Sequence, residues 1–504
     1  MNDYFAYDWI EKWANYTPEK LIFKDHLSQK QWSYSDFNIR TKAIASFLQN
    51  ELNLKKGDRL AIYSFNRPEH VFLFFACVKT GIIFVPLNYR LTHLEISVLL
   101  NDAEPSVLIY EKALEETADK LNYKKETIKS IEISVFSEFL FGPASPKETI
   151  ISFQINQEDT VLILYTSGTT GIPKGVMINH RMLFWNSINT EIRLNITSDD
   201  HTQNYAPFFH TGAWNVLLTP FIHHGASLTL LPNFDPDLIL KLFQEEKTTI
   251  FFGVPTMLQM MADSQLFGKT DFSSIRYAVV GGAPMPIPLI NKWHDKGVEI
   301  RQGYGLTEVG PNCFSLHQDD AKRKIGSIGF PNFYIAAKII DDKGKECSSN
   351  DVGELCLKSP VVTPGYWKKP DETANAIKDG WFRTGDLVRK DAEGYYYVVD
   401  RKKNMFISGG ENVYPAEIES VIRSNSNVSD CAVIGVPDVK WGEVGKAFII
   451  LKNKNISDNE IIKFCIEKTA KYKIPKYIRF VEELPRNEAG KLDRKKLYEI
   501  NNNK

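Results

Sequence analysis

Residues 165–175 read YTSGTTGIPKG, and this stretch indicates both the fold and the chemistry of the chain. It follows an apolar run at 161–164, which predicts a buried strand that ends where the loop begins. The glycines let backbone N–H groups approach an anion, the Ser and Thr hydroxyls add donors, and Lys174 adds a positive charge. The stretch therefore predicts a loop that cradles phosphates.

This loop does not have the spacing of a kinase-type P-loop. Such a loop has Gly directly before its lysine and Ser or Thr directly after it. Lys174 instead stands between Pro173 and Gly175. The nucleotide is therefore expected to be handled by a different chemistry.

Length and composition indicate a globular protein of at least two domains. A chain of 504 residues is too long for one hydrophobic core, and 43% of its residues are hydrophobic. The six cysteines form no Cys-x-x-Cys pair, which argues against a structural zinc and a disulfide framework and favours a cytoplasmic location. The most apolar stretch, 71–87, is interrupted by Lys79 and Gly81, so we expect no membrane span.

The charge is close to balanced over the whole chain but not within its last part. A net charge of −1 offers no polybasic surface for nucleic acid. Residues 401–504 nevertheless contain 20 Lys and Arg against 14 Asp and Glu. Taken alone, this basic end is equally consistent with a solvated lysine-rich face and with a site for an anionic ligand.

Alternating apolar and helical patterns from residue 59 onward predict an α/β fold with largely parallel sheets. The expected strands are 59–65, 82–86, 106–110, 161–165 and 276–280, and the expected helices include 68–80 and 93–101. Closely spaced strands at 336–340, 353–358 and 395–399 then predict a small β-rich subdomain. After the charged run 400–403, helices are expected near 415–424 and 459–470. We therefore predict a large N-terminal domain, 1–400, and a small α+β C-terminal domain, 401–504.

Two downstream motifs add to the phosphate loop. The small residues of GGAPM at 281–285 follow an expected strand and leave room for a flat ring against the backbone. In QGYGLTE at 302–308, Glu308 stands where a dinucleotide fingerprint would have its third glycine, and a carboxylate there suits a magnesium ion beside phosphates. Asp386 is a candidate acceptor for ribose hydroxyls. Each motif alone is as consistent with an ordinary turn at a strand end.

Together, and in this order, the motifs resemble those of the adenylate-forming superfamily, which includes acyl-CoA synthetases, peptide-synthetase adenylation domains and luciferases. The resemblance covers nearly the whole chain. Besides the loop, the matching blocks are YAPFFHTGAWN at 205–215, GGAPM at 281–285, QGYGLTE at 302–308, GWFRTGDL at 380–387, DRKKNMFISGGENVYPAEIE at 400–419 and PRNEAGKLDRKKL at 485–497. The block at 400–419 is most similar to bacterial fatty acyl-CoA synthetases.

The resemblance implies an ATP-dependent ligase that works in two steps. A carboxylic acid attacks the α-phosphate of ATP to give an acyl adenylate and pyrophosphate, and the thiol of coenzyme A then displaces AMP to give acyl-CoA. A fatty acid is the preferred substrate. An aryl or short-chain carboxylate, and transfer of the adenylate to a carrier protein, are the alternatives.

The resemblance also assigns roles to residues, most of them in the first predicted domain. Magnesium would be held by Thr166 and Glu308. The residues implied for ATP and AMP are Thr166, Ser167, Gly168, Thr169, Thr170, Lys174, Gly282, Ala283, Gln302, Gly303, Tyr304, Gly305, Thr307, Asp386, Arg401 and Lys491. The residues implied for the acyl pocket are His210, Trp214, Gly281 and Gly305. The catalytic group would comprise Lys491, His210, Glu308 and Thr307, with His210 in a positional role and not as a general base.

The C-terminal domain is expected to be mobile, with a hinge at Lys403, and to present Lys491 to ATP in the first step. The residues implied for coenzyme A are Gly409, Gly410, Trp441, Tyr472, Lys473 and Lys476. The expected partners are thus a carboxylate, ATP with Mg²⁺, and coenzyme A, without nucleic acid. Peripheral membrane contact and the choice between a monomer and a homodimer stay open.

Overall fold

The computed structural model describes residues 7–121, 128–143, 154–166, 173–283, 285–409, 411–452, 456–487 and 491–502. By its internal packing the chain divides into two compact units. The first unit comprises residues 1–337 and 357–382, and the second comprises residues 338–356 and 383–504. The division runs through three strands, β16, β17 and β19, whose bounds are given with the second unit.

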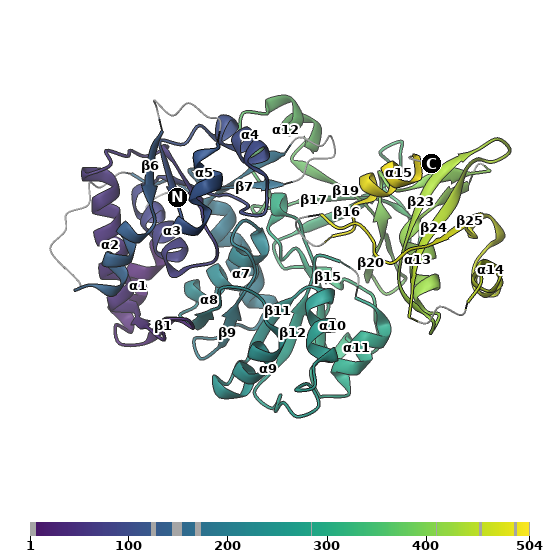
Figure 1. Ribbon diagram of the computed structural model, residues 1–504, viewed down its shortest axis with the longest axis horizontal. Coiled ribbons are helices and arrows are strands. Elements are labelled where there is room, and N and C mark those ends of the chain that lie inside the picture. Colours follow the sequence, from purple (N-terminus) through teal and green to yellow (C-terminus); the bar gives the residue numbers. More distant parts are fainter. Residues whose placement is uncertain are drawn as a thin grey trace. The chain divides into compact units, whose positions relative to one another are not determined.

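The described part of the first unit contains three sheets (Figure 1). Their strand orders are β2-β1-β10-β9, β6-β5-β3-β4-β7-β8 and β11-β12-β13-β14-β15. The strands are β1 Leu21–Asp25, β2 Gln31–Ser33, β3 Arg59–Tyr63, β4 Ile83–Pro86, β5 Val107–Tyr110, β6 Lys129–Glu132, β7 Thr160–Thr166, β8 Lys174–Asn179, β9 His201–Asn204, β10 Ser227–Leu230, β11 Ile250–Gly253, β12 Tyr277–Val280, β13 Ile300–Tyr304, β14 Phe314–Ser315 and β15 Phe330–Pro331. Strands β6, β5, β3, β4 and β7 pair in parallel, as do β11, β12 and β13. The predicted α/β class with mostly parallel sheets is confirmed.

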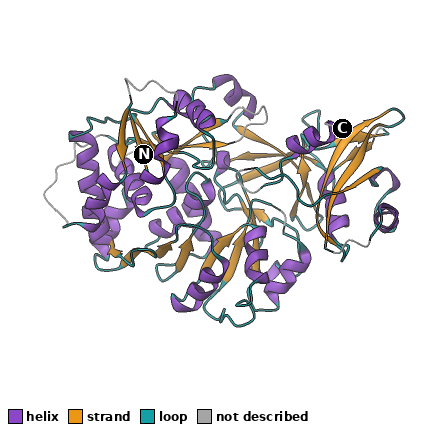
Figure 2. Cartoon of the chain, in the orientation of Figure 1, coloured by secondary structure: helices purple, strands orange, loops and turns teal. Residues whose placement is uncertain are grey.

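Helices flank these sheets, as the purple ribbons of Figure 2 show. They are α1 Trp9–Tyr16, α2 Tyr34–Asn50, α3 Pro68–Thr80, α4 His93–Ala103, α5 Glu115–Asp119, α6 Ser134–Phe141, α7 His180–Leu194, α8 Leu218–His223, α9 Pro236–Glu245, α10 Pro255–Asp263, α11 Ile287–His294 and α12 Pro370–Ala376. Short turns of other helix types are η1 Lys112–Leu114, η2 Gly212–Val216, η3 Thr307–Val309 and η4 Gln318–Asp320. None of the helices in the described ranges combines the length and the apolarity needed to cross a membrane.

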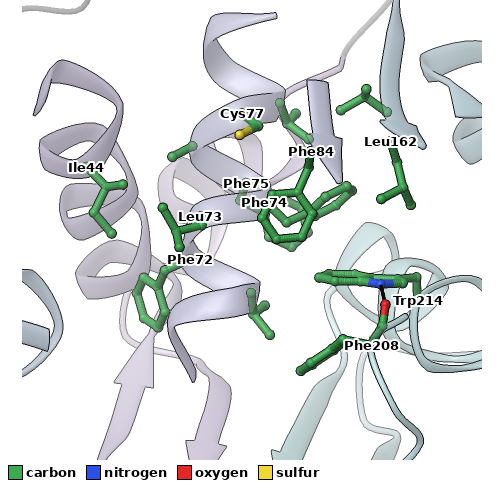
Figure 3. Packing of buried hydrophobic residues seen from close by; sticks show 14 of the residues in the cluster. Ile44, Phe72, Leu73, Phe74, Phe75, Cys77, Phe84, Leu162, Phe208 and Trp214 are labelled. Carbon is green, nitrogen blue, oxygen red and sulfur yellow. Dashed lines mark hydrogen bonds between the residues drawn. The ribbon is translucent and has the colours of Figure 1, made fainter. Parts of the chain in front are cut away.

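Helix α3 forms the centre of the largest hydrophobic core of the first unit. It begins with Pro68, which suits the first turn, and ends before Gly81, whose φ of 71° is left-handed. All of its residues are buried, as expected for a helix that is apolar on every side. Phe72 stacks on Phe37 of α2, with ring centroids 4.0 Å apart, and Figure 3 shows the same cluster extending to Trp214.

Two further sheets contain the described strands of the second unit, and one of them also includes β18, which belongs to the first unit. One has the order β16-β17-β19-β18, with β20 also pairing β19, and the other has the order β22-β21-β24-β23, with β25 pairing β24. The strands are β16 Ala336–Ile340, β17 Gly353–Lys358, β18 Ile377–Lys378, β19 Trp381–Lys390, β20 Tyr396–Arg401, β21 Phe406–Ser408, β22 Glu411–Val413, β23 Val428–Asp438, β24 Gly442–Leu451 and β25 Tyr477–Phe480. The helices are α13 Pro415–Arg423, α14 Asp458–Ile466, η5 Lys471–Lys473 and α15 Arg494–Asn502.

Most expected elements lie within one or two residues of their observed bounds, but the helix expected at 459–470 ends earlier. A capping box of Ser457 and Glu460 starts α14, and the helix ends at Ile466. The carbonyl oxygen of Cys465 then accepts from the N–H groups of Lys468 and Thr469, which closes a tight turn. The residues that follow form η5.

Candidate active site

The phosphate loop connects β7 to β8 in an antiparallel hairpin. Thr166, the last residue of β7, lies directly opposite Lys174, the first residue of β8. The predicted loop residues Ser167, Gly168, Thr169 and Thr170 lie outside the described residues. A side chain at Gly175 would come within 2.8 Å of Ile163, so the two strands need glycine here to pack this closely.

Two groups hold the side chain of Lys174. Its ammonium forms an ion pair with Glu372 of α12. It also lies 5.2 Å from the centre of the Tyr366 ring, within the range of a cation–π contact. A cation held beside the end of the hairpin is suited to a phosphate group.

Glu308 contacts the same tyrosine. It lies in η3, and the hydroxyl of Tyr366 donates a hydrogen bond to Glu308 Oε1 at 3.1 Å. Thr363 ties η3 to β8, because its N–H donates to the Glu308 carbonyl at 2.7 Å and its hydroxyl donates to the Met177 carbonyl at 2.6 Å. Lys174 and Glu308, distant in sequence, therefore meet at one side chain.

Sequence reasoning missed Tyr366. Its signal is the stretch TPGYWKKP at 363–370, in which prolines and a glycine surround two aromatic residues. Nothing in that pattern points to phosphate or metal, and the contacts that give Tyr366 meaning exist only in three dimensions.

The donor set here fits a magnesium ion. Mg²⁺ prefers hard oxygen ligands and takes few of them from protein when phosphates and water supply the rest. The Glu308 carboxylate and the Thr166 hydroxyl provide oxygens of this kind, and their role in holding magnesium stays a prediction. Thr307, the first residue of η3, adds a hydroxyl beside Glu308.

The residues predicted for adenine follow two neighbouring parallel strands. Val280 of β12 pairs with Gln302 of β13, so the segment 281–283 and the end of β13 lie at the same edge of the sheet. Gly282 has a left-handed φ of 81°, and a side chain at Gly281 would contact the Gly303 carbonyl at 3.6 Å. Small residues therefore keep the backbone open to a flat ring.

The rest of QGYGLTE packs closely. Gln302 is buried, and its Oε1 has no hydrogen-bond partner among the described residues. An unpartnered buried acceptor is costly, and a donor such as the adenine amino group would satisfy it. Tyr304 packs edge-on against Phe314. A side chain at Gly305 would collide with the Pro311 carbonyl, so only glycine fits there.

The residues predicted for the acyl pocket lie at different depths. His210 is partly exposed and contacts Phe209, with ring centroids 4.4 Å apart. Trp214 is completely buried in the hydrophobic core, where its indole N–H donates to the Phe208 carbonyl at 2.6 Å (Figure 3). Burial in the core is by itself a sufficient reason for a large aromatic side chain at position 214. The role of Trp214 in an acyl pocket stays a prediction.

Phe252 of β11 is a further candidate for the acyl side. A side chain at Gly212 would come 3.2 Å from its ring, and one at Gly281 would come 3.9 Å from it. The hydroxyl of Tyr205 donates to the Phe252 carbonyl at 2.6 Å. The ring thus lies beside two glycines in segments already assigned to the substrate, a proximity that the sequence alone does not reveal.

The ribose candidates belong to the second unit. Asp386 of β19 pairs with Arg401 of β20, and their side chains form an ion pair. Lys403, the predicted hinge, follows in a turn, where burial and the charge of Arg401 lower the pKa of its ammonium. Asp400 accepts hydrogen bonds from Asn404 Nδ2 at 2.9 Å and from Ala416 N at 2.8 Å. Burial raises the pKa of the Asp400 carboxyl, although these bonds oppose the shift.

Part of the predicted coenzyme A site converges at one hairpin. Gly409 has a left-handed φ of 60°, donates to the Trp441 carbonyl at 2.8 Å, and has space for no side chain against the Trp441 ring. Trp441 is 46% exposed, which leaves one face for stacking. Gly410 lies outside the described residues.

The predicted phosphate lysines are already paired. Lys476 forms an ion pair with Asp438, and Lys473 forms one with Glu417 at 2.6 Å, close to the partly exposed Tyr472. Lys440, which was not predicted, lies 4.8 Å from the Trp441 ring centre and forms no salt bridge with any residue that the structure describes. It is therefore the more available cation at this hairpin.

Lys491 belongs to the second unit and stands next to an isolated antiparallel bridge between Arg486 and Leu492. Its N–H donates to Asn487 Oδ1 at 3.0 Å, and the N–H of Asn487 donates back to the Lys491 carbonyl at 2.7 Å. Arg486 forms an ion pair with Asp430 at 2.6 Å. Lys491 is exposed, and its catalytic role stays a prediction.

Comparisons with known proteins identify the family of the chain. A family model described as AMP-binding enzyme matches residues 10–367, and one described as AMP-binding enzyme C-terminal domain matches residues 417–491. The chain is 36% identical to the feruloyl-CoA synthase of an Amycolatopsis species, over 91% of this chain and 92% of that protein. It is 35% identical to the long-chain-fatty-acid–CoA ligase FadD13 of Mycobacterium tuberculosis, over 95% of each chain. The O-succinylbenzoate coenzyme A synthetase of Bacillus subtilis, solved with ATP and magnesium, matches with a TM-score of 0.87 and 30% identity over 97% of this chain and 99% of that one.

Proposed function

Because the chain belongs to the family of AMP-binding enzymes, we propose that its substrate is a fatty acid, which it converts to an acyl-CoA. The chain is an AMP-forming acid–CoA ligase, and its predicted place among adenylate-forming enzymes is confirmed. In the first step a carboxylate oxygen bonds to the α-phosphorus of ATP and pyrophosphate leaves. In the second step the coenzyme A thiol attacks the acyl carbonyl carbon and AMP leaves.

One observation carries the ATP-dependent part of this proposal. Lys174 lies over the Tyr366 ring, and the hydroxyl of that ring holds Glu308. Lys174, proposed for phosphate, and Glu308, proposed for magnesium, thus contact the same side chain, Tyr366, at the end of the hairpin. When bound, Mg²⁺ would offset negative charge on the phosphates and on the leaving pyrophosphate.

The proposed roles of the other residues follow from their positions. Thr166 and Lys174 would grip the β- and γ-phosphates, while Thr307 would contact the α-phosphate. Gly282, Ala283 and Tyr304 would bracket the adenine. Asp386 and Arg401 would bind the ribose, and Lys491 would bring its charge to the carboxylate and the α-phosphate. Such fixed donors lower the barrier because they need little reorganisation as charge develops.

We also propose the predicted domain alternation. Residues 401–504 would turn about Lys403 after the first step. Lys491 would then leave the active site, and the segment at Gly409 would enter it. Trp441 would then stack on the adenine of coenzyme A. Lys491 and Trp441 lie in two separate segments of the C-terminal part, which supports two uses of it.

The acyl side supports a fatty acid. Phe209, Phe252 and the glycines at 212 and 281 offer an apolar lining near His210. These four residues are uncharged, and the guanidinium of Arg90 lies 5.7 Å from the centre of the Phe209 ring. The long-chain relative at 35% identity agrees with this reading.

An aryl carboxylate is the second candidate. The Phe252 ring lies next to Gly212 and Gly281, and a flat aryl group could stack on it. The feruloyl-CoA synthase relative, at 36% identity, supports this alternative.

Carboxylate-dependent pyrophosphate release separates these candidates. The panel would run from acetate to palmitate and would include benzoate, ferulate and 2-succinylbenzoate, each with and without coenzyme A. We expect the highest kcat/KM for a fatty acid of medium or long chain, with thioester formed only when coenzyme A is present. A preference for an aryl acid would replace the fatty-acid proposal with the second candidate, and adenylate without thioester would point to a carrier protein.

A further inference from the structure

Tyr366 contacts two residues of the proposed ATP site through two different parts of its side chain. The hydroxyl donates to Glu308 Oε1 at 3.1 Å, and the ring face lies 5.2 Å from Lys174 Nζ. The first contact is a hydrogen bond to a charged acceptor, and the second is a cation–π contact. No other described side chain is seen to contact both Lys174 and Glu308.

The backbone around Tyr366 is held on both sides. Its N–H donates to Thr373 Oγ1 at 2.9 Å, and the residue forms an isolated bridge with Val176 of β8. Met177 donates to the Gly365 carbonyl at 3.1 Å, and Trp367 donates to the Gly175 carbonyl at 2.7 Å. The segment is therefore hydrogen-bonded to β8 on both sides of Tyr366, and these bonds fix the backbone that carries the ring.

We propose that Tyr366 is a positioning residue of the ATP site, which orients Glu308 for magnesium through its hydroxyl and keeps Lys174 at the phosphates through its ring. This inference rests on the proposed function of the site and adds a residue to it. Groups that hold a metal ligand in place can matter nearly as much as the ligand itself.

The ion pair between Lys174 and Glu372 explains why the ring is needed. The ammonium is paired with the Glu372 carboxylate on α12. When phosphate binds, the ammonium must exchange one anion for another. The ring is uncharged and does not compete with phosphate, so it can keep the ammonium in place during this exchange.

The first test removes only the hydroxyl. Binding of ATP to the full chain would be measured by calorimetry without carboxylate, once with Mg²⁺ and once with EDTA. For Tyr366→Phe we expect affinity to fall about tenfold with Mg²⁺ and to stay unchanged with EDTA. Equal affinity of the wild type and Tyr366→Phe in Mg²⁺ would overturn the proposal.

The second test asks which partner the hydroxyl acts through. Added to Glu308→Gln, the Tyr366→Phe change should weaken binding by less than about twofold, because its partner carboxylate is already gone. Added to Lys174→Met, it should keep its full effect, because the hydroxyl acts through Glu308 and not through the Lys174 ammonium. The same fold-loss in both backgrounds would indicate a general structural effect and contradict the positioning role.

The third test separates this proposal from the proposed function. Thioester formation from a supplied acyl adenylate should be unchanged in Tyr366→Phe, since neither metal nor Lys174 acts in that step. Tyr334→Phe, which removes the hydroxyl of a tyrosine outside the site, is the matched control and should bind ATP like the wild type. Failure of the wild type to bind ATP would refute the proposed function, whereas normal wild-type binding with an unaffected Tyr366→Phe would refute only the role of Tyr366.

Discussion

Asp386 and Arg401 lie opposite each other in β19 and β20, and their side chains also meet, with Arg401 Nε 2.5 Å from Asp386 Oδ1. Asp386 is only 3% exposed, whereas the side chain of Arg401 is 42% exposed. An unpaired carboxylate would be costly to bury, and attraction to the positive charge of Arg401 compensates for this cost. The two residues proposed for the ribose are thus a preformed pair.

Asp386→Asn should weaken ATP binding by removing the charged acceptor for the ribose hydroxyls. We expect KM for ATP to rise about tenfold, as for the loss of a hydrogen bond to a charged group. The preference for ATP over 2′-deoxy-ATP should shrink at the same time. Asp379→Asn is a suitable control, because its positive φ of 52° is readily adopted by asparagine. An unchanged preference for the ribose hydroxyl would remove Asp386 from the site.

Lys491→Ala should separate the two half-reactions. Without the ammonium, pyrophosphate release should fall by at least about a hundredfold, as for the loss of one preorganised electrostatic group. Conversion of a supplied acyl adenylate to thioester should stay near the wild-type rate. Lys495→Ala, an exposed change on α15, is the control for both assays. Equal loss of the two half-reactions would contradict domain alternation.

Lys440→Ala should affect coenzyme A more than Lys476→Ala does. Lys476 must give up its ion pair with Asp438 to bind a phosphate, whereas Lys440 lies over Trp441 with no such pair among the described residues. We expect a rise of roughly three- to tenfold in KM for coenzyme A in Lys440→Ala, with adenylate formation unchanged. Kinetics with coenzyme A and dephospho-coenzyme A would show whether the 3′-phosphate is the group contacted. A larger effect in Lys476→Ala would restore the original assignment.

Glu246→Gln should alter the pH dependence of stability. Burial alone raises the pKa of this carboxyl, but hydrogen bonds from His201 and Lys24 outweigh burial and lower the pKa from 4.5 to about 2. A lowered folded-state pKa contributes stability that is fully present above pH 4.5 and is lost as pH falls toward 2. Urea unfolding between pH 5.5 and 3.5 should therefore show a steeper acid loss in the wild type than in Glu246→Gln. The full contribution is roughly 3 kcal/mol.

The neighbouring Glu245→Gln change is the control for this measurement, because Glu245 is exposed on the same helix. It should keep the wild-type pH profile. If Glu246→Gln also keeps it, the network of His201, Lys24 and Glu246 does not set the acid stability of the first unit.

Local patterns predicted the parts of the fold that depend on local physics. The expected bounds match for the helix at 68–80 and for the strands at 336–340 and 353–358. Their signals act over a few residues: proline at the start of the helix, glycine after its end, and the period of the apolar residues. The end of α14 was harder to predict, since the turn at Cys465 depends on backbone hydrogen bonds and not on a breaking residue. The packing of the β-rich strands with the C-terminal part in one compact unit depends on contacts between distant segments.

The candidate site shows the same division. Thr166, Lys174 and Glu308 stand in motifs whose residue types suggest their chemistry. Tyr366 and Phe252 stand in ordinary-looking stretches, and only their neighbours in space assign them a role. The ion pair between Lys476 and Asp438 could not be predicted either, because the number of lysines in a segment does not show which of them form ion pairs.

Asp400 also accepts a hydrogen bond from Arg401 N at 2.6 Å, but its bonds from Asn404 and Ala416 have a mechanical meaning. Asp400 precedes the proposed pivot at Lys403, while its donors, Asn404 and Ala416, follow it. A rotation that moves these donors away from Asp400 must break both hydrogen bonds to its buried carboxylate. Asp400 would then hold the C-terminal part in one orientation. The change to the other orientation would be abrupt, because both hydrogen bonds must break before the rotation can proceed.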